Sequence, residues 1–89
     1  MDSELELKGN RLWAGDAEII LSGVEYNLFL ALWNCRGHLA FYDELIERVW
    51  GPVDQQGDLH KLHQSISRLR AKLPPGTIYT RKNLGYGIL

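Results

Sequence analysis

The 89-residue sequence contains one cysteine, Cys35, three prolines and no long run of apolar residues. A single cysteine forms no internal disulfide, so the chain needs no oxidising compartment in order to fold. Its apolar runs fall far short of the about 20 residues that cross a bilayer, and the acidic, polar start of the chain is unlike a secretory signal. We therefore expect a cytoplasmic protein, and a chain of this length forms one compact domain.

The sequence also lacks the residue groupings that mark catalytic and metal sites. It has no glycine-rich phosphate loop, and nothing groups Cys35 with a catalytic base. His60 and His63 are three residues apart with Asp58 close by, but the zinc-site patterns of two cysteines with two histidines, or of His-Glu-x-x-His, are missing. We expect no enzyme activity, no metal ion and no cofactor, and we interpret His63 as a partly packed side chain.

Acidic residues are absent after Asp58, although the net charge of the whole chain is only −1. Residues 1–58 hold eleven acidic and four basic residues, a net charge of −7, whereas residues 59–89 hold six basic residues and a net charge of +6. This asymmetry indicates a basic surface that meets an anion, most often nucleic acid or an anionic membrane. A solvated basic surface without a ligand is the alternative.

Short apolar runs near the N-terminus predict a small antiparallel sheet. Leu5 and Leu7 alternate with charged residues, and two further runs begin at Leu12 and Ile19. Gly-Asn and Gly-Asp turn signals separate these runs. Strands joined by tight turns are therefore expected over about residues 4–21.

A first helix is predicted over about residues 22–36. It begins at Ser22 with a capping box in which Glu25 is the partner, and Gly37 is its expected stop. The helix is apolar over most of its circumference, which predicts the most buried helix of the domain. Its stripe consists of Tyr26, Phe29, Leu30 and Trp33, widened by Leu28 and Leu32.

A second, shorter helix is predicted over about residues 42–50, ended by Gly51-Pro52. Two acids in its first turn suit the helix dipole. The expected buried face consists of Leu45, Ile46, Val49 and Trp50, and the acidic residues expected to face water are Asp43, Glu44 and Glu47.

The clearest helix is predicted over about residues 58–73, with Asp58 as N-cap and Pro74-Pro75-Gly76 as the stop. Its inner stripe consists of Leu59, Leu62, Ile66, Leu69 and Leu73. Its outer face, with Arg70 at the flank, consists of His60, Lys61, Gln64, Ser67, Arg68, Ala71 and Lys72. Arginine and glutamine form bidentate bonds to guanine and adenine edges, and no acid interrupts this face, so it predicts contact with nucleic acid.

A C-terminal β-hairpin is predicted over about residues 77–89, with a basic tip at Arg81, Lys82 and Asn83. Asn83 and Gly85 are the positions expected to adopt positive φ in the turn. A short basic ribbon reaches a minor groove or phosphates. Together with the preceding helix, the tip would contact a duplex at two points.

Four ordered motifs give the chain a family resemblance. They are Leu21-Ser22-x-x-Glu25-Tyr26, Asp43-Glu44-Leu45-Ile46-x-x-Val49-Trp50-Gly51, Ile66-Ser67-Arg68-Leu69-Arg70-x-Lys72-Leu73, and Ile78-x-Thr80 followed by Gly85-Tyr86. The sequence resembles, over nearly its whole length, the OmpR/PhoB-type DNA-binding domain of transcriptional regulators. The resemblance implies an α+β winged helix–turn–helix fold, in which an N-terminal sheet and three helices precede a hairpin called the wing.

The resemblance also implies roles for single residues in binding double-stranded DNA. Arg68 falls at the family's base-reading position and Arg70 at its phosphate-contacting arginine, while Lys61 and Gln64 fall on the groove-facing surface. Lys82 falls where the family places a wing arginine in the minor groove. The loop that contacts RNA polymerase in some members corresponds here to Val53, Asp54, Gln55 and Gln56. Members often bind direct repeats as head-to-tail pairs.

Three positions depart from the family pattern: Phe41 stands where a serine or threonine cap is usual, Asn83 where the wing has glycine, and Gly87 where the wing has arginine. Gly87 removes one wing contact with DNA. A winged-helix module that binds another protein, with weak or no DNA binding, is therefore the alternative function. Membrane binding is a weaker alternative, because the basic helix uses its apolar stripe for its own core.

Overall fold

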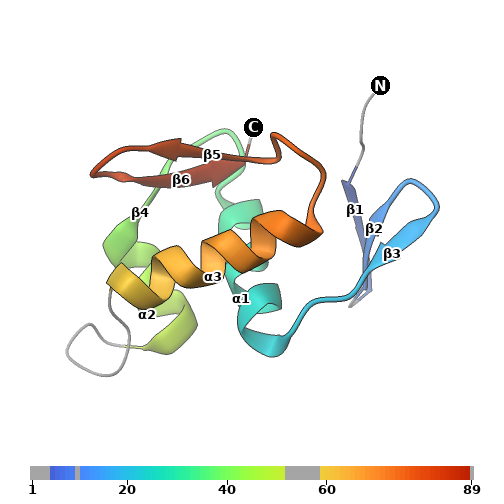
Figure 1. Ribbon diagram of the computed structural model, residues 1–89, viewed down its shortest axis with the longest axis horizontal. Coiled ribbons are helices and arrows are strands. Elements are labelled where there is room, and N and C mark those ends of the chain that lie inside the picture. The colour runs from blue at the N-terminus through green and yellow to red at the C-terminus, as the bar shows by residue number, and fades with distance from the viewer. Residues whose placement is uncertain (1–4, 10, 52–58, 89) are drawn as a thin grey trace.

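The computed structural model describes residues 5–9, 11–51 and 59–88 of the chain. Two small antiparallel sheets and three helices follow one another in the expected order, which confirms the α+β winged helix–turn–helix architecture (Figure 1). The elements are β1 (Leu5–Lys8), β2 (Arg11–Ala14), β3 (Ala17–Ile19), α1 (Gly23–Asn34), β4 (Ala40–Phe41), α2 (Tyr42–Trp50), α3 (Leu59–Lys72), β5 (Ile78–Arg81) and β6 (Gly85–Ile88).

The N-terminal sheet has the strand order β1-β2-β3 and stands at one end of the elongated molecule (Figure 1). The register pairs Leu7 with Leu12 and Leu12 with Ile19, so these side chains share one face. Leu12 is only 1% exposed, and Leu7 and Ile19 pack against the same core. The small antiparallel sheet predicted from the first twenty residues is therefore confirmed.

Helix α1 begins as the sequence predicted. The Glu25 backbone N–H donates to Ser22 Oγ at 3.2 Å, and the Ser22 N–H donates to the Glu25 carboxylate at 2.9 Å. The helix ends at Asn34, two residues before the predicted end, and Gly37, at φ +83°, lies in the turn that follows. Residues 35–37 form a turn, in which the Gly37 N–H donates to the Ile88 carbonyl oxygen at 3.1 Å instead of continuing the helix.

The face of α1 that is buried differs from the predicted stripe. The fully buried side chains include Leu28, Phe29 and Leu32, whereas Tyr26, Leu30 and Trp33 are half-buried. The prediction was wrong here, because a helix that is apolar on nearly every side leaves its orientation to the neighbouring helices. Leu28 and Leu32, which the sequence placed at the edge of the apolar stripe, lie at the centre of the buried face.

Helix α2 begins without a capping side chain. Phe41 occupies the N-cap, and the Glu44 carboxylate accepts a bond from the Phe41 N–H at 3.2 Å. Leu45 and Ile46 are buried, while Asp43, Glu44 and Glu47 are exposed, as predicted. One half of a capping box therefore compensates for the missing serine or threonine.

The C-terminal hairpin is part of a three-stranded sheet of order β4-β6-β5. The short strand β4, which the sequence did not predict, pairs Ala40 with Tyr86. Asn83 adopts φ +66°, which confirms the expected turn conformation. Gly85 does not have a positive φ; a Cβ there would overlap the carbonyl oxygen of Ala40, so close approach of β4 accounts for this glycine.

The core lies between the three helices and the inner face of the second sheet. Helix α3 contributes Leu62, Ile66 and Leu69, each 1% exposed or less. Leu59 is 43% exposed, so the predicted inner stripe was wrong at its first position. The first turn of α3 lies at the end of the molecule away from the N-terminal sheet (Figure 1).

Candidate nucleic-acid interface

The predicted outer face of α3 points away from the core. Leu62, Ile66 and Leu69 fix the rotation of the helix by their burial, so the residues between them are turned outward. The residues of this face are His60, Gln64, Ser67, Arg68, Ala71 and Lys72, all exposed, and Lys61, which is half-buried. No acidic residue interrupts the helix from Leu59 to Lys72.

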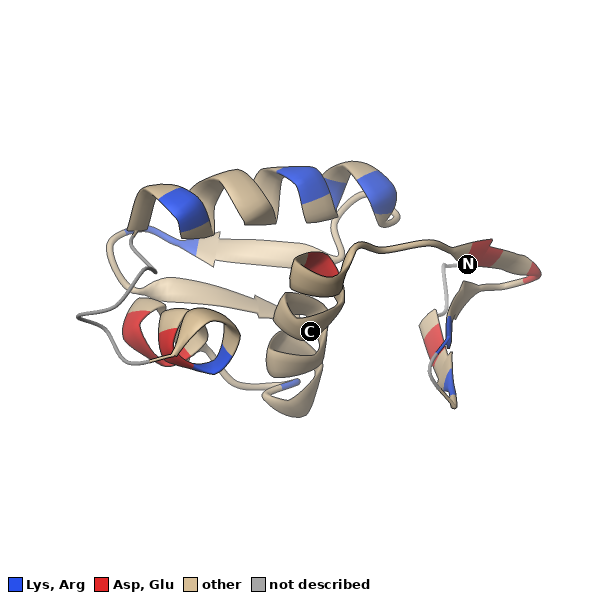
Figure 2. Ribbon diagram, turned by 90° about the horizontal axis from the view of Figure 1, so that it is seen from below, with Lys and Arg blue, Asp and Glu red and all other residues tan. Residues whose placement is uncertain are grey.

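The tip of the β5–β6 hairpin extends the basic surface. Arg81, Lys82 and Asn83 are exposed. Figure 2 shows basic but no acidic positions along α3 and at the hairpin tip, whereas α2 and the N-terminal sheet carry positions of both signs and the start of α1 carries an acidic one. The basic C-terminal part of the sequence thus forms one surface of the folded domain, and the acidic residues that the structure describes lie on other surfaces. We name α3 from His60 to Lys72, together with Arg81, Lys82 and Asn83, the basic face.

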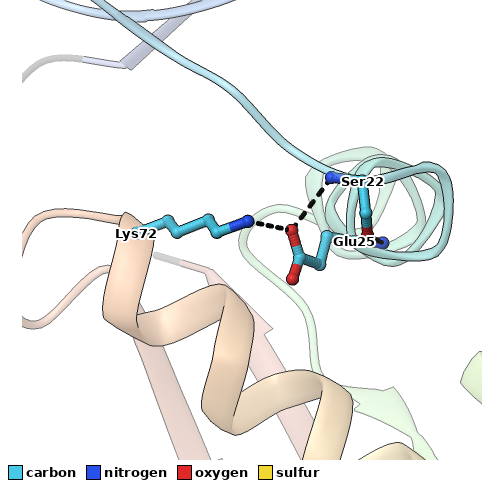
Figure 3. Close-up of polar contacts among 3 residues, drawn as sticks. All are labelled: Ser22, Glu25 and Lys72. Carbon is cyan, nitrogen blue, oxygen red and sulfur yellow. Dashed lines mark hydrogen bonds and ion pairs between the residues drawn. The ribbon is translucent and has the colours of Figure 1, made fainter.

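Lys72 has a partner within the molecule. Its Nζ lies 2.7 Å from the Glu25 carboxylate oxygen that also accepts from the Ser22 N–H (Figure 3). The Lys72 hydrogen bond, followed by that from Ser22, lowers the pKa of Glu25 from its ordinary value of 4.5. Sequence reasoning missed this pair, since the two residues are 47 positions apart and only the packing of α3 against α1 joins them.

Arg70 also bonds within the molecule. Its Nη2 donates to the Ile78 carbonyl oxygen at 3.1 Å and to Thr80 Oγ1 at 2.5 Å, both on β5. Its Cζ lies 5.6 Å from the centre of the Tyr86 ring on β6. The flank position expected for Arg70 is therefore the side of α3 that packs against the wing.

His63 lies about two turns before Arg70 on α3 and makes a second side-chain bond to the wing. Its Nδ1 is hydrogen-bonded to the Tyr86 hydroxyl, and its ring packs edge-on against Tyr42 and Tyr86. Burial raises the pKa of the Tyr86 hydroxyl above its ordinary value of 10.0, which keeps the hydroxyl protonated and able to donate. The interpretation of His63 as a partly packed side chain is confirmed.

Two further expectations concern sites away from the basic face. Val53, Asp54, Gln55 and Gln56, predicted to contact RNA polymerase, and the predicted N-cap Asp58 lie outside the described residues. Within residues 5–9, 11–51 and 59–88, no three histidine, cysteine or acidic side chains are grouped so as to hold a metal ion. Among the described helices, none has the length and apolar composition that crossing a membrane requires.

Comparison with known families decides the identity of the domain. The family model described as "Transcriptional regulatory protein, C terminal" matches residues 16–88. The chain belongs to this family. It is an OmpR/PhoB-type DNA-binding domain of transcriptional regulatory proteins. All four motifs lie within the matched segment, so the resemblance seen in the sequence is confirmed.

Two relatives of this OmpR/PhoB-type domain are regulatory proteins of bacteria. Regulatory protein VanRB of Enterococcus faecalis is 33% identical over 76 residues, which are 85% of this chain and 34% of VanRB. Transcriptional regulatory protein KdpE of Mycobacterium tuberculosis is 30% identical over 87 residues, 92% of this chain and 38% of KdpE. The chain thus spans little more than a third of the length of these relatives.

Solved structures show the same fold as this OmpR/PhoB-type domain. The RstA DNA-binding domain of Klebsiella pneumoniae, solved in complex with the RstA box, has a TM-score of 0.83 and 25% identity over 99% of this chain and 94% of its own. The DNA-binding domain of Bacillus subtilis CssR has a TM-score of 0.81 and 21% identity, covering 97% of this chain and 100% of its own. The similarity to CssR supports the fold alone.

Proposed function

We propose that the domain binds double-stranded DNA with α3 in the major groove and the tip of the wing at the minor groove. The observation that supports this most is the basic face: an exposed helix side free of acids beside an exposed basic hairpin tip, with acidic residues on other surfaces. A single α-helix fits the major groove of B-form DNA, where each base pair presents a distinct donor and acceptor pattern.

Base discrimination comes from the polar side chains at the centre of the outer face. Arg68 and Gln64 have the donor geometry for guanine and adenine edges, and both are exposed. Ser67 and Ala71 are small, so they let the helix backbone approach the groove closely. His60 and Lys61 lie one turn earlier on the same face and add contacts to bases or phosphates.

Affinity comes from cations at phosphates. Arg81 and Lys82 contact the backbone beside the minor groove, with Asn83 shaping the turn between them and β6. Arg70 and Lys72 belong to the same set, although both already bond within the molecule. A guanidinium has five N–H groups and the described bonds of Arg70 use one nitrogen, so a phosphate contact remains open to it.

The test is direct binding to duplex DNA. We expect the domain to bind a mixed-sequence duplex at low salt, and selection from a random duplex library to give a defined site. Arg68→Ala should relax the preference at one base pair of that site. Arg48→Ala, which removes an exposed cation on α2, is the matched control and should leave it unchanged. A selection without enrichment would contradict sequence-specific binding.

Further partners follow from the family resemblance. We propose that the segment Val53, Asp54, Gln55 and Gln56 contacts RNA polymerase, and that two copies bind direct repeats head to tail. A regulator of transcription acts on the chromosome, so we also propose a cytoplasmic location. Pull-down of polymerase with variants of the four residues, and the stoichiometry of domain on a two-repeat duplex, test these two contacts.

A module that binds another protein is the second candidate function. The observation that favours it is Gly87, which stands where the family's wing arginine is usual, in a chain of net charge −1. This function predicts little or no binding to duplex DNA even at low salt, so the same titration separates the two candidates.

A further inference from the structure

We propose that Arg70 is a positioning residue, which holds the wing at a fixed place relative to α3 and so sets the spacing between the two DNA contacts. The proposal rests on the DNA-binding function and goes beyond the phosphate contact that the resemblance implies. It begins from three contacts of one side chain: Ile78 O and Thr80 Oγ1 accept from Arg70, and the Tyr86 ring lies beneath it.

The three contacts span both strands of the wing. Ile78 and Thr80 lie on β5, and Tyr86 pairs with Thr80 across the hairpin from β6. Arg70 therefore contacts both strands of the hairpin at the Thr80–Tyr86 pair, close to the turn that carries Arg81 and Lys82. A planar guanidinium with several donors suits two acceptors and an aromatic face at once, whereas the ammonium of lysine acts as a point charge.

A hairpin held only at its base would leave the tip free to pivot. The base of the wing is fixed by Ile78 and Ile88, which are buried in the core. On β5, the edge strand, the next bond toward the tip is made by Arg70 to Thr80. On the other strand, β6 is bonded to His63 through the Tyr86 hydroxyl and is also held by β4, where Phe41 pairs with Gly85 and the Tyr42 N–H donates to the Leu84 carbonyl oxygen at 3.0 Å. Beyond this level, Arg81 to Leu84 are exposed. The β6 side of the tip is therefore held by β4, whereas the position of β5 relative to α3 depends on the side chain of Arg70.

The first experiment needs no DNA. Amide hydrogen exchange of β5 and β6 in Arg70→Ala should be faster by about three- to tenfold than in the unchanged domain, because a charged hydrogen-bond donor to an exposed strand is lost. Arg68→Ala removes an exposed arginine of the same helix and is the matched control, with unchanged exchange in the wing. Equal exchange in Arg70→Ala and the unchanged domain would overturn the proposal, whatever the domain binds.

The second experiment separates positioning from phosphate contact. If Arg70 acts through the wing, Lys82→Ala should weaken DNA binding several-fold in the unchanged domain but less than about twofold in the Arg70→Ala background. If Arg70 acts only at a phosphate, the two effects on affinity multiply independently, and Arg70→Lys restores much of the affinity. Independent effects together with rescue by lysine would overturn the proposal.

A milder variant covers the case in which Arg70→Ala fails to fold. Thr80→Val removes one acceptor and leaves the arginine and its charge in place. We expect a smaller acceleration of exchange confined to the wing, and a reduced effect of Lys82→Ala on affinity. Absence of DNA binding by the unchanged domain, together with faster wing exchange in Arg70→Ala, would refute the proposed function while leaving the positioning role intact.

Discussion

The ammonium group of Lys72 lies 2.7 Å from the carboxylate of Glu25, which joins the last turn of α3 to the first turn of α1. The carboxylate side is 9% exposed and the lysine side 43%. The C-terminal end of α3, the helix proposed to bind DNA, is therefore fixed to α1 by this ion pair, in which the Glu25 carboxylate is largely shielded from solvent. The same pair neutralises one cation of the basic face.

Replacing Glu25 should destabilise the domain in a pH-dependent way. Glu25→Gln is expected to lower the free energy of unfolding by about 1–2 kcal/mol at pH 7. The substitution removes the negative charge that accepts hydrogen bonds from Lys72 and from the Ser22 N–H. The pKa of Glu25 is lower in the folded state than its ordinary value of 4.5, which applies to the unfolded chain. The carboxylate therefore contributes to folding stability at pH values above 4.5, and this contribution is lost as the pH falls through the pKa of the folded state.

Urea unfolding between pH 7 and pH 3 measures this effect. The free energy of unfolding should fall more between pH 7 and pH 3 for the unchanged domain than for Glu25→Gln. The two free energies should become similar near pH 3. Glu47→Gln, on the exposed side of α2, is the control and should change stability by less than about 0.5 kcal/mol. A Glu25→Gln variant as stable as the unchanged domain at pH 7 would contradict the role of the pair.

The cations of the basic face should differ in their contribution to salt dependence. Each lysine or arginine that neutralises a phosphate changes the slope of log affinity against log salt by about 0.9. Lys82→Gln should therefore reduce the slope by about that amount, whereas Lys72→Gln should change it by much less, because Glu25 already pairs with Lys72. Equal reductions for the two variants would show that Lys72 leaves Glu25 when DNA binds.

The two glycines of β6 should respond differently to an added methyl group. A Cβ at Gly85 would overlap the carbonyl oxygen of Ala40, which is backbone, so Gly85→Ala is expected to cost about 3 kcal/mol or more. A Cβ at Gly87 would lie 2.6 Å from the end of the Tyr79 ring, a side chain that can move aside. Gly87→Ala should cost less than about 1.5 kcal/mol, and thermal unfolding of both variants measures the difference.

Arg68→Ala should weaken binding to the selected DNA site by about 1–3 kcal/mol and relax the preference at one base pair. Affinities for single-base variants of the site measure both effects. A loss of the same size on every sequence would assign Arg68 to a phosphate and exclude a base-reading role.

Local signals in the sequence predicted the elements of this fold well. The capping box at Ser22 and Glu25, the turn at Asn83 and the burial of Leu62, Ile66 and Leu69 all follow from short-range rules, and all are confirmed. The buried face of α1 was predicted wrongly, because a helix apolar on nearly every side has no preferred orientation until its neighbours pack against it.

The contacts that join distant parts of the basic face had no local signal. Lys72 and Arg70 looked like surface cations, and only the packing of α3 beside α1 and the wing brings Glu25, Ile78 and Thr80 within bonding distance of them. Gly85 was predicted for its φ angle, but the neighbouring strand β4, two residues long, explains it. A strand of that length leaves no readable pattern in a sequence.

Titration of the domain onto a duplex that carries its selected site, over a series of salt concentrations, tests the central claim most directly. With Lys61, Arg70, Arg81 and Lys82 at phosphates, log affinity should fall linearly with log salt, with a slope between about −3 and −5. Absence of binding at low salt, or a slope near zero, would contradict the claim that the basic face binds duplex DNA.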